Sequence, residues 1–107
     1  MAKVPWLDTV TIPNANQNYV LLDLIQVADA AFNMRRSAAI GIQADKDAGA
    51  AVFFIGNAGM SGTKYGCSLV ATQLYSIAFE LNLIMLDDIH VRCTVAGQLL
   101  HLTLVTK

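Results

Sequence analysis

The sequence predicts one mainly β domain, a β-sandwich or jelly-roll-like fold with at most one short helix. Apolar and polar residues alternate in short runs, at Ser37–Ala44, Ile89–Thr94 and Gln98–Thr106. Glycine and asparagine punctuate the chain at intervals of roughly 8–12 residues, a spacing typical of antiparallel sandwiches and jelly rolls. A chain of 107 residues has room for one domain with its own core.

The first seven residues predict an extended arm, residues 1–7, ahead of a β-sandwich domain at 8–107. They show no periodicity, and Pro5 cannot donate a ladder hydrogen bond. Trp6 is the only tryptophan, and tryptophan is a favoured interface anchor because one ring buries a large area. The alternative is that the Trp6 ring folds back over one open end of the sandwich. We take as interface candidates in this arm Val4, Pro5, Trp6 and Leu7.

The next segment predicts a strand, a turn and a helix. Asp8–Ile12 alternates and ends at Pro13, and the following turn offers Asn16 as a helix cap. From there, apolar residues at helical spacing and the lack of glycine or proline favour a short helix over about residues 18–28. A strand at Tyr19–Gln26 is the alternative.

The remaining two thirds of the chain predicts strands separated by turns. Asp45–Gly49 is rich in turn residues, and Gly59–Gly66 has the glycine content of a loop. Ala96-Gly97 predicts a hairpin turn between the last two strands, which would make His90 and His101 outward-facing neighbours. The expected strands are Ser37–Ala44, Ala50–Ile55, Ser68–Val70, Leu74–Phe79, Ile89–Thr94 and Gln98–Thr106.

The composition predicts self-association. Hydrophobic residues make up 55% of the chain and charged residues 14%, against about 25% charged in ordinary soluble domains. No run of apolar residues is long enough for a transmembrane helix, so we expect no membrane partner. The excess apolar surface then belongs in a subunit interface, and we expect a homo-oligomer.

The net charge, the N-terminal residues and the cysteines predict the absence of nucleic-acid binding and of secretion. A net charge of −1 argues against nucleic-acid binding, and Arg35-Arg36 is the only basic pair. We expect this pair to be solvated or ion-paired, and we add Arg35 and Arg36 to the interface candidates. The N-terminus has no apolar run of the signal-peptide type, so we expect synthesis in a cytoplasm and reduced thiols at Cys67 and Cys93.

Motifs for catalysis, cofactors or metals are missing from the sequence. His90 and His101 supply half a metal site, and the pairs Asp45/Asp47 and Asp87/Asp88 do not match a calcium loop. The glycine-rich stretch Gly56–Lys64 lacks the lysine position of a phosphate loop. We therefore expect no enzyme activity, no cofactor and no metal.

The second half of the chain resembles small virion proteins of tailed bacteriophages, over roughly residues 40–107. The residues that carry the resemblance are Ile42–Asp45, Gly49, Val52–Asn57, Met60-Ser61, Tyr65-Gly66, Leu69, Ile89–Arg92, Ala96-Gly97 and Leu100. The resemblance implies a β-sandwich or jelly-roll protein on the capsid surface, a cement (decoration) protein that binds the major capsid protein or other virion proteins. A collar or tail accessory protein is the alternative within this class. In a different class, a carbohydrate-binding jelly-roll module would use exposed aromatics such as Trp6, Tyr19, Tyr65 and Tyr75.

Overall fold

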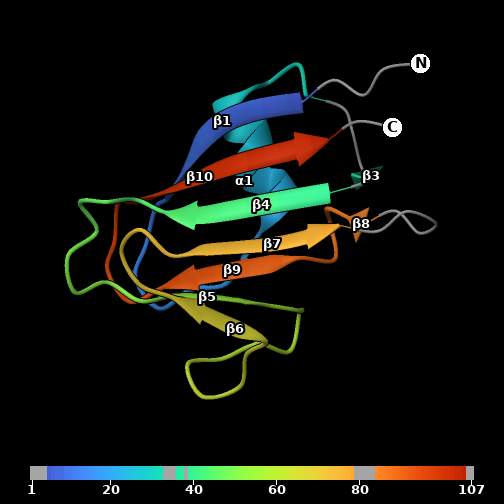
Figure 1. Ribbon diagram of the computed structural model, residues 1–107. Coiled ribbons are helices and arrows are strands. Elements are labelled where there is room, and N and C mark those ends of the chain that lie inside the picture. The colour runs from blue at the N-terminus through green and yellow to red at the C-terminus, as the bar shows by residue number, and fades with distance from the viewer. Residues whose placement is uncertain (1–4, 33–35, 38, 79–83, 106–107) are drawn as a thin grey trace.

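The computed structural model describes residues 5–32, 36–37, 39–78 and 84–105. It is mainly β, as predicted, with two antiparallel four-stranded sheets and one helix, α1 (Leu21–Ala28) (Figure 1). Sheet A contains, in spatial order, β1 (Pro5–Ile12), β10 (Gln98–Val105), β4 (Ala39–Ala44) and β7 (Leu74–Ala78). Sheet B contains β2 (Tyr19–Val20), β9 (His90–Cys93), β5 (Phe53–Gly56) and β6 (Cys67–Leu69). A separate pair joins β3 (Arg36–Ser37) and β8 (Ile84–Met85).

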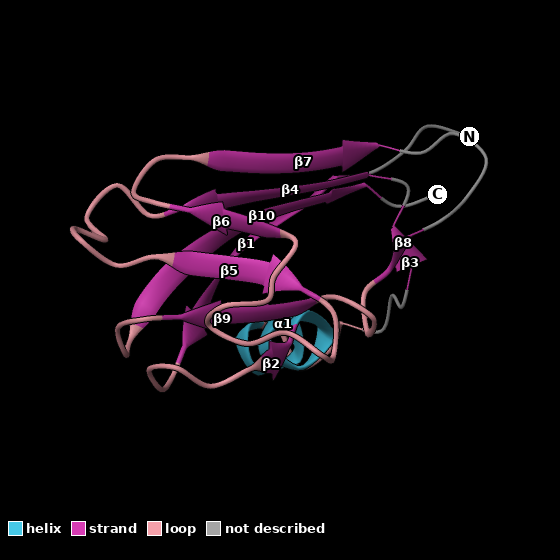
Figure 2. Ribbon diagram, turned by 90° about the horizontal axis from the view of Figure 1, so that it is seen from below, coloured by secondary structure: helices cyan, strands magenta, loops and turns pink. Residues whose placement is uncertain are grey.

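The strand pairing has the order of a jelly roll. Each strand pairs with its counterpart from the other end of the chain: β1 with β10, β2 with β9, β3 with β8, β4 with β7 and β5 with β6. The pairings of β10 with β4 and of β9 with β5 then join these ribbons into the two sheets. One long antiparallel ribbon wound into two packed layers is the jelly-roll arrangement. Figure 2 shows the two layers; α1 packs against β1 and β2.

The core lies between the layers and follows the period of two. Within β4, Ile40, Ile42 and Ala44 are buried while Gln43 is exposed, which is the alternation that the sequence predicts for Ser37–Ala44. Sheet B turns Phe53, Ile55, Val91 and Cys93 inward against them. Burying an aliphatic side chain of this size stabilises the fold by about 1.5–3 kcal/mol.

The helix prediction is confirmed, with a later start. Leu21, Leu22, Leu24 and Ile25 of α1 are buried at helical spacing against the sheets, and the strand alternative holds only for Tyr19–Val20. Asn16 does not cap the helix: the N-cap is Val20, and it makes no side-chain cap bond. Instead, Leu21 N–H donates to the Ile89 carbonyl at 2.8 Å. The first N–H group of the helix is therefore bonded to the residue before β9, which is distant in sequence.

The first strand begins at Pro5, three residues earlier than predicted. Pro5, Trp6 and Leu7 pair in register with Val105, Leu104 and Thr103, so their backbone belongs to sheet A and not to an arm. Proline is tolerated there because β1 is an edge strand. The remaining arm residues, 1–4, lie outside the described residues.

The predicted C-terminal hairpin is wrong. β9 lies in sheet B and β10 in sheet A, so the turn at Ala96-Gly97 carries the chain from one layer to the other. Gly97 has a φ of 74° and its N–H donates to the Ile12 carbonyl at 2.8 Å. A tight glycine turn occurs both in hairpins and in connections between sheets, so the turn sequence alone does not distinguish the two. His90 and His101 therefore lie on opposite outer faces and are not neighbours.

Candidate functional site

The outer surface of sheet A is the most distinctive surface of the described residues, and we call it the sheet A face. It consists of the side chains that alternate with the buried ones on β1, β10, β4 and β7. Two exposed leucines lie at its opposite edges, Leu7 on β1 with 67% of its surface exposed and Leu74 on β7 with 62%. The described members are Leu7, Thr9, Thr11, Ala39, Gly41, Gln43, Leu74, Ser76, Leu99, His101 and Thr103.

The described sheet A face carries no Asp, Glu, Lys or Arg. Asp8 is the only such residue in these four strands, and it alternates with Leu7 and Thr9, so it belongs to the other side of β1. Natural proteins place charged side chains on exposed edge strands to disfavour unwanted contacts, and here neither edge strand carries one on this face. The described face is therefore uncharged, with threonine, serine, glutamine and histidine side chains between two exposed leucines at its edges.

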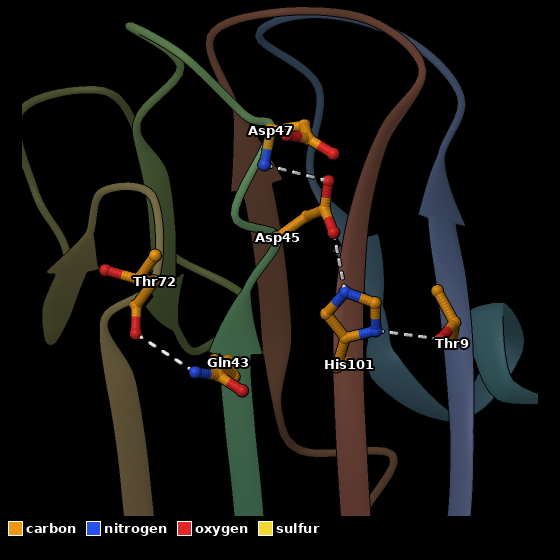
Figure 3. A network of polar contacts seen from close by, with 6 residues as sticks. All are labelled: Thr9, Gln43, Asp45, Asp47, Thr72 and His101. Carbon is orange, nitrogen blue, oxygen red and sulfur yellow. Dashed lines mark hydrogen bonds and ion pairs between the residues drawn. The ribbon is translucent and has the colours of Figure 1, made fainter.

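A chain of hydrogen bonds crosses the end of this face, from β1 over β10 to the turn after β4 (Figure 3). Thr9 Oγ1 lies 2.9 Å from His101 Nδ1, and His101 Nε2 lies 2.8 Å from Asp45 Oδ1. Thr9 and His101 are direct cross-strand partners, so strand register brings them together. The other carboxylate oxygen of Asp45 accepts from Asp47 N–H at 3.2 Å.

The positions of the hydrogens in the Thr9–His101–Asp45 network follow from the chemistry of its groups. An ionised carboxylate only accepts, so His101 Nε2 carries the hydrogen that points to Asp45. In the tautomer that carries its hydrogen on Nε2 alone, Nδ1 accepts from the Thr9 hydroxyl. The hydrogen bond from His101 holds the pKa of Asp45 below its ordinary value of 3.8, and backbone N–H donors of the turn add to this.

The order hydroxyl, imidazole, carboxylate is also that of a hydrolase triad. A triad needs its nucleophile in a substrate hollow beside donors for an oxyanion. The hollow next to His101, of about 330 Å³, is lined by Gln43, Ala44, Asp45, Lys46, Thr72 and His101, and Thr9 is not among them. We therefore interpret the three side chains as a structural network.

The amide of Gln43 is also tied to a partner on the protein. Gln43 Nε2 donates to the Thr72 carbonyl at 3.1 Å (Figure 3). Thr72 has a φ of 69°, and its N–H donates to the Ala44 carbonyl, so the turn before β7 is held against β4. The longer polar side chains of the sheet A face, Gln43 and His101, thus have intramolecular partners.

The outer surface of sheet B differs because a loop covers it. Residues 57–66 fold back so that Met60 is buried outside the main core and the Tyr65 ring lies 4.5 Å from the Phe54 ring, centroid to centroid. Asn18 Nδ2 donates to the Met60 carbonyl at 2.6 Å, and Arg92 donates to Asn18 Oδ1 at 3.3 Å. His90, predicted to be outward, and Arg92 both alternate with buried residues of β9 and are only partly exposed.

The described interface candidates come from two separate pairs of strands. Leu7 is exposed on the sheet A face, while Pro5 and Trp6 are placed by their backbone in β1. Arg36 begins β3, in the separate two-stranded pair. Val4 and Arg35 lie outside the described residues.

Sequence reasoning missed most of the sheet A face. In each of these predicted strands, the positions that alternate with the buried residues are uncharged. This shared property identifies one surface only when the order of the strands in the sheet is known. The Asp45–His101 contact joins residues 56 positions apart and has no local signal.

The thiols and acidic groups show no metal-binding arrangement among the described residues. Cys67 and Cys93 are both free, and no group of three or more His, Cys, Asp or Glu side chains is placed to hold a metal ion there. Burial raises the pKa of the Cys93 thiol, and burial likewise raises the pKa of the Tyr75 hydroxyl. No helix in the described part of the chain has the length and apolar character of a membrane span.

Comparisons of the chain with protein-family models, with curated proteins and with solved structures found no match.

Proposed function

We propose that this chain is a structural protein of a bacteriophage virion, a capsid cement or decoration protein that acts through protein–protein contacts. The observation that carries the proposal is the sheet A face. It exposes Leu7 and Leu74, carries no charged side chain among its described residues, and ties His101 and Gln43 to intramolecular partners. Such a surface loses little when water is removed from it, which suits an element of a permanent assembly.

The fold is compatible with this role by analogy. Jelly rolls of two four-stranded sheets are a common architecture of viral capsid proteins, and also of lectins and cupins. Because one fold hosts many functions, this analogy supports the proposal without deciding it. The resemblance of residues 40–107 to small virion proteins of tailed phages favours the capsid branch of the analogy.

The test is to look for the chain in purified particles of the phage whose genome encodes it. Quantitative mass spectrometry of intact heads and of separated tails would give its copy number and location. We expect many copies per head, and lowered thermal stability of heads that lack the chain. A single ring of copies at the neck or tail would support the collar or tail accessory role instead. Absence from the particle would overturn the proposal.

A carbohydrate-binding role is the second candidate, and one observation favours it. Tyr65 is 46% exposed, whereas Tyr19 and Tyr75 are partly buried. Its ring borders a hollow of about 230 Å³ that is also lined by Asn57 and Lys64. Sugar rings stack on exposed aromatic faces beside polar donors. Binding to a glycan array that is lost in Tyr65→Ala and kept in Tyr19→Ala would favour this role.

A further inference from the structure

We infer that the partner of the sheet A face is a second copy of this chain, packed face to face about a twofold axis parallel to the strands. The inference rests on the proposed function only in treating this face as a protein contact surface. It names the occupant of that surface, and it does not depend on the chain being part of a virion.

Charge is the first reason to place a second copy there. In a twofold interface the same surface meets itself, so a charged patch would meet a patch of its own sign. The described sheet A face avoids this penalty because it has no Asp, Glu, Lys or Arg. Charged groups lie beyond its end, in the turn that contains Asp45 and Lys46.

The polar groups of the face give the second reason. A buried polar group without a partner costs about 1–3 kcal/mol. His101 bonds Thr9 and Asp45 within its own chain, and Gln43 bonds the Thr72 carbonyl. The threonine and serine hydroxyls are short and can turn toward a partner or a trapped water. The face therefore needs no complementary charge or matched donor set from a different protein.

Symmetry gives the third reason. Sheet A runs β1-β10-β4-β7, so a twofold axis between β10 and β4, parallel to the strands, places β1 of each copy over β7 of the other. Leu7 then lies over the edge that carries Leu74 of the second copy, one row of side chains away, and this contact occurs twice. The same operation places Thr103 over Gly41 of the second copy, because these two residues share one row of the sheet.

The size of the face sets the expected strength of the dimer. Four strands spaced about 4.8 Å apart, with roughly seven residues of about 3.4 Å each, cover on the order of 450 Å² per copy before side-chain relief is added. Two such faces bury roughly 900 Å² in total before that relief, below the roughly 1,200 Å² at which standard specific interfaces begin, so this contact belongs to the weak, transient class. We expect a dimer whose population changes with concentration in the micromolar range.

Gly41 offers a clean position for a test. A Cβ there would lie 3.6 Å from Thr103 Cβ and 3.8 Å from Leu74 Cδ1, which are ordinary contacts, and its backbone does not require glycine. Gly41→Lys therefore adds a charge at the centre of the face without forcing the strand. Thr103→Glu adds the opposite charge at an exposed position on the strand beside it.

The experiment is sedimentation equilibrium on the full chain over a wide concentration range. We expect wild type to dimerise, and Gly41→Lys and Thr103→Glu each to weaken self-association on the order of 100-fold, because like charges meet across the axis. Mixing the two variants should restore the dimer, since the introduced lysine of one chain then faces the introduced glutamate of the other. Val27→Lys, on an exposed helix position, is the matched control and should dimerise as wild type does.

Each other outcome overturns the inference. A wild type that stays monomeric at all concentrations removes the second copy. Dimers that persist in both charge variants place the interface on another surface, and variants that fail to recombine exclude the facing geometry. Far-UV circular dichroism confirms that each variant is folded. If Gly41→Lys is not, Ser76→Lys and Leu7→Glu replace the two charge variants, because both residues are exposed and share one row, so that each faces the other across the axis. Failure here leaves the particle experiment untouched, so the two proposals fail separately.

Discussion

At the scale of single residues, the Asp45–His101–Thr9 chain gives the protein a defined response to acid. The pKa of Asp45 is lower in the folded protein than its ordinary value, so folding favours the ionised carboxylate. This contribution is fully present above the ordinary value of 3.8 and is lost as the pH falls through the lower folded value. Acid therefore weakens the tie between the turn after β4 and the end of β10.

The prediction is that Asp45→Asn removes this part of the pH dependence. The free energy of unfolding of the variant should be lower than that of wild type at neutral pH, and the difference should shrink as the pH falls below 3.8. Urea unfolding at a series of pH values measures it. Asp47→Asn removes the same charge two residues away and should leave the wild-type profile intact. A constant difference between Asp45→Asn and wild type at every pH would contradict the prediction.

The two cysteines differ in a way that the sequence does not show. The sequence predicts reduced thiols at both positions, and both are free, but only Cys93 is fully buried, with a thiol pKa raised by burial. The thiolate is the reactive form, so Cys93 should resist alkylation in the native protein. Mass spectrometry after brief iodoacetamide treatment should find Cys93 unmodified, and modified once denaturant is added. Rapid native labelling of Cys93 would contradict its position in the core.

At the scale of elements, sequence patterns predicted the features that depend on residues close together in the chain. The period of two identified the buried residues of β4, and helical spacing identified α1. The helix start was missed because Tyr19–Val20 pairs with β9, a partner about 70 positions along the chain. The C-terminal hairpin was wrong for the same reason, since a glycine turn serves a hairpin and a crossing between sheets equally well.

The loop at residues 57–66 supports a prediction about local opening. Met60 and the Asn18 amide hold this loop on sheet B, and Lys64 within it is exposed to trypsin. Met60→Ala should cost the closed loop about 2 kcal/mol, which raises the open population, and so cleavage after Lys64, by about 30-fold.

Lys46, in the exposed turn after β4, is the internal control for this experiment. Cleavage there should proceed at the same rate in wild type and Met60→Ala, because the turn follows β4 of sheet A whereas the loop joins β5 to β6 of sheet B. Timed digestion with peptide mapping separates the two sites. Equal acceleration at both sites would indicate global destabilisation and would contradict a local role for Met60.

At the scale of the whole molecule, the sequence predicted the fold class but not the order of the strands. Alternation and turn spacing indicate a sandwich, and they carry no information on which strands pair. The jelly-roll order arises from pairings such as Pro5 with Val105, which join opposite ends of the chain. The sheet A face could not be predicted for this reason, because its members come from four strands that are dispersed in sequence.

This order predicts slow folding that a circular permutation accelerates. β1 and β10 form eight residue pairs, and the long loop between them must close before these pairs stabilise the fold. The two described ends of the chain, Pro5 and Val105, are paired with each other at one end of sheet A (Figure 1). Joining residue 107 to residue 1 links Val105 to Pro5 through residues 106–107 and 1–4, a length suited to a strand connection. New termini between Gly49 and Ala50, both exposed, leave every strand intact.

In the permuted chain the β1–β10 pairing becomes local, while the five-residue β4–β7 pairing becomes more distant. The β1–β10 pairing, which becomes local, has more residue pairs than the β4–β7 pairing, which becomes more distant. The mean sequence separation of contacts therefore falls, and folding should accelerate by about tenfold or more. Stopped-flow refolding from urea measures both rates, and far-UV circular dichroism confirms that the two chains share one fold. A permutant that folds to the same structure at the wild-type rate would show that β1–β10 pairing is not limiting. The slow step would then lie in the other connections that carry the chain between sheet A and sheet B, such as those that follow β4, β6 and β9.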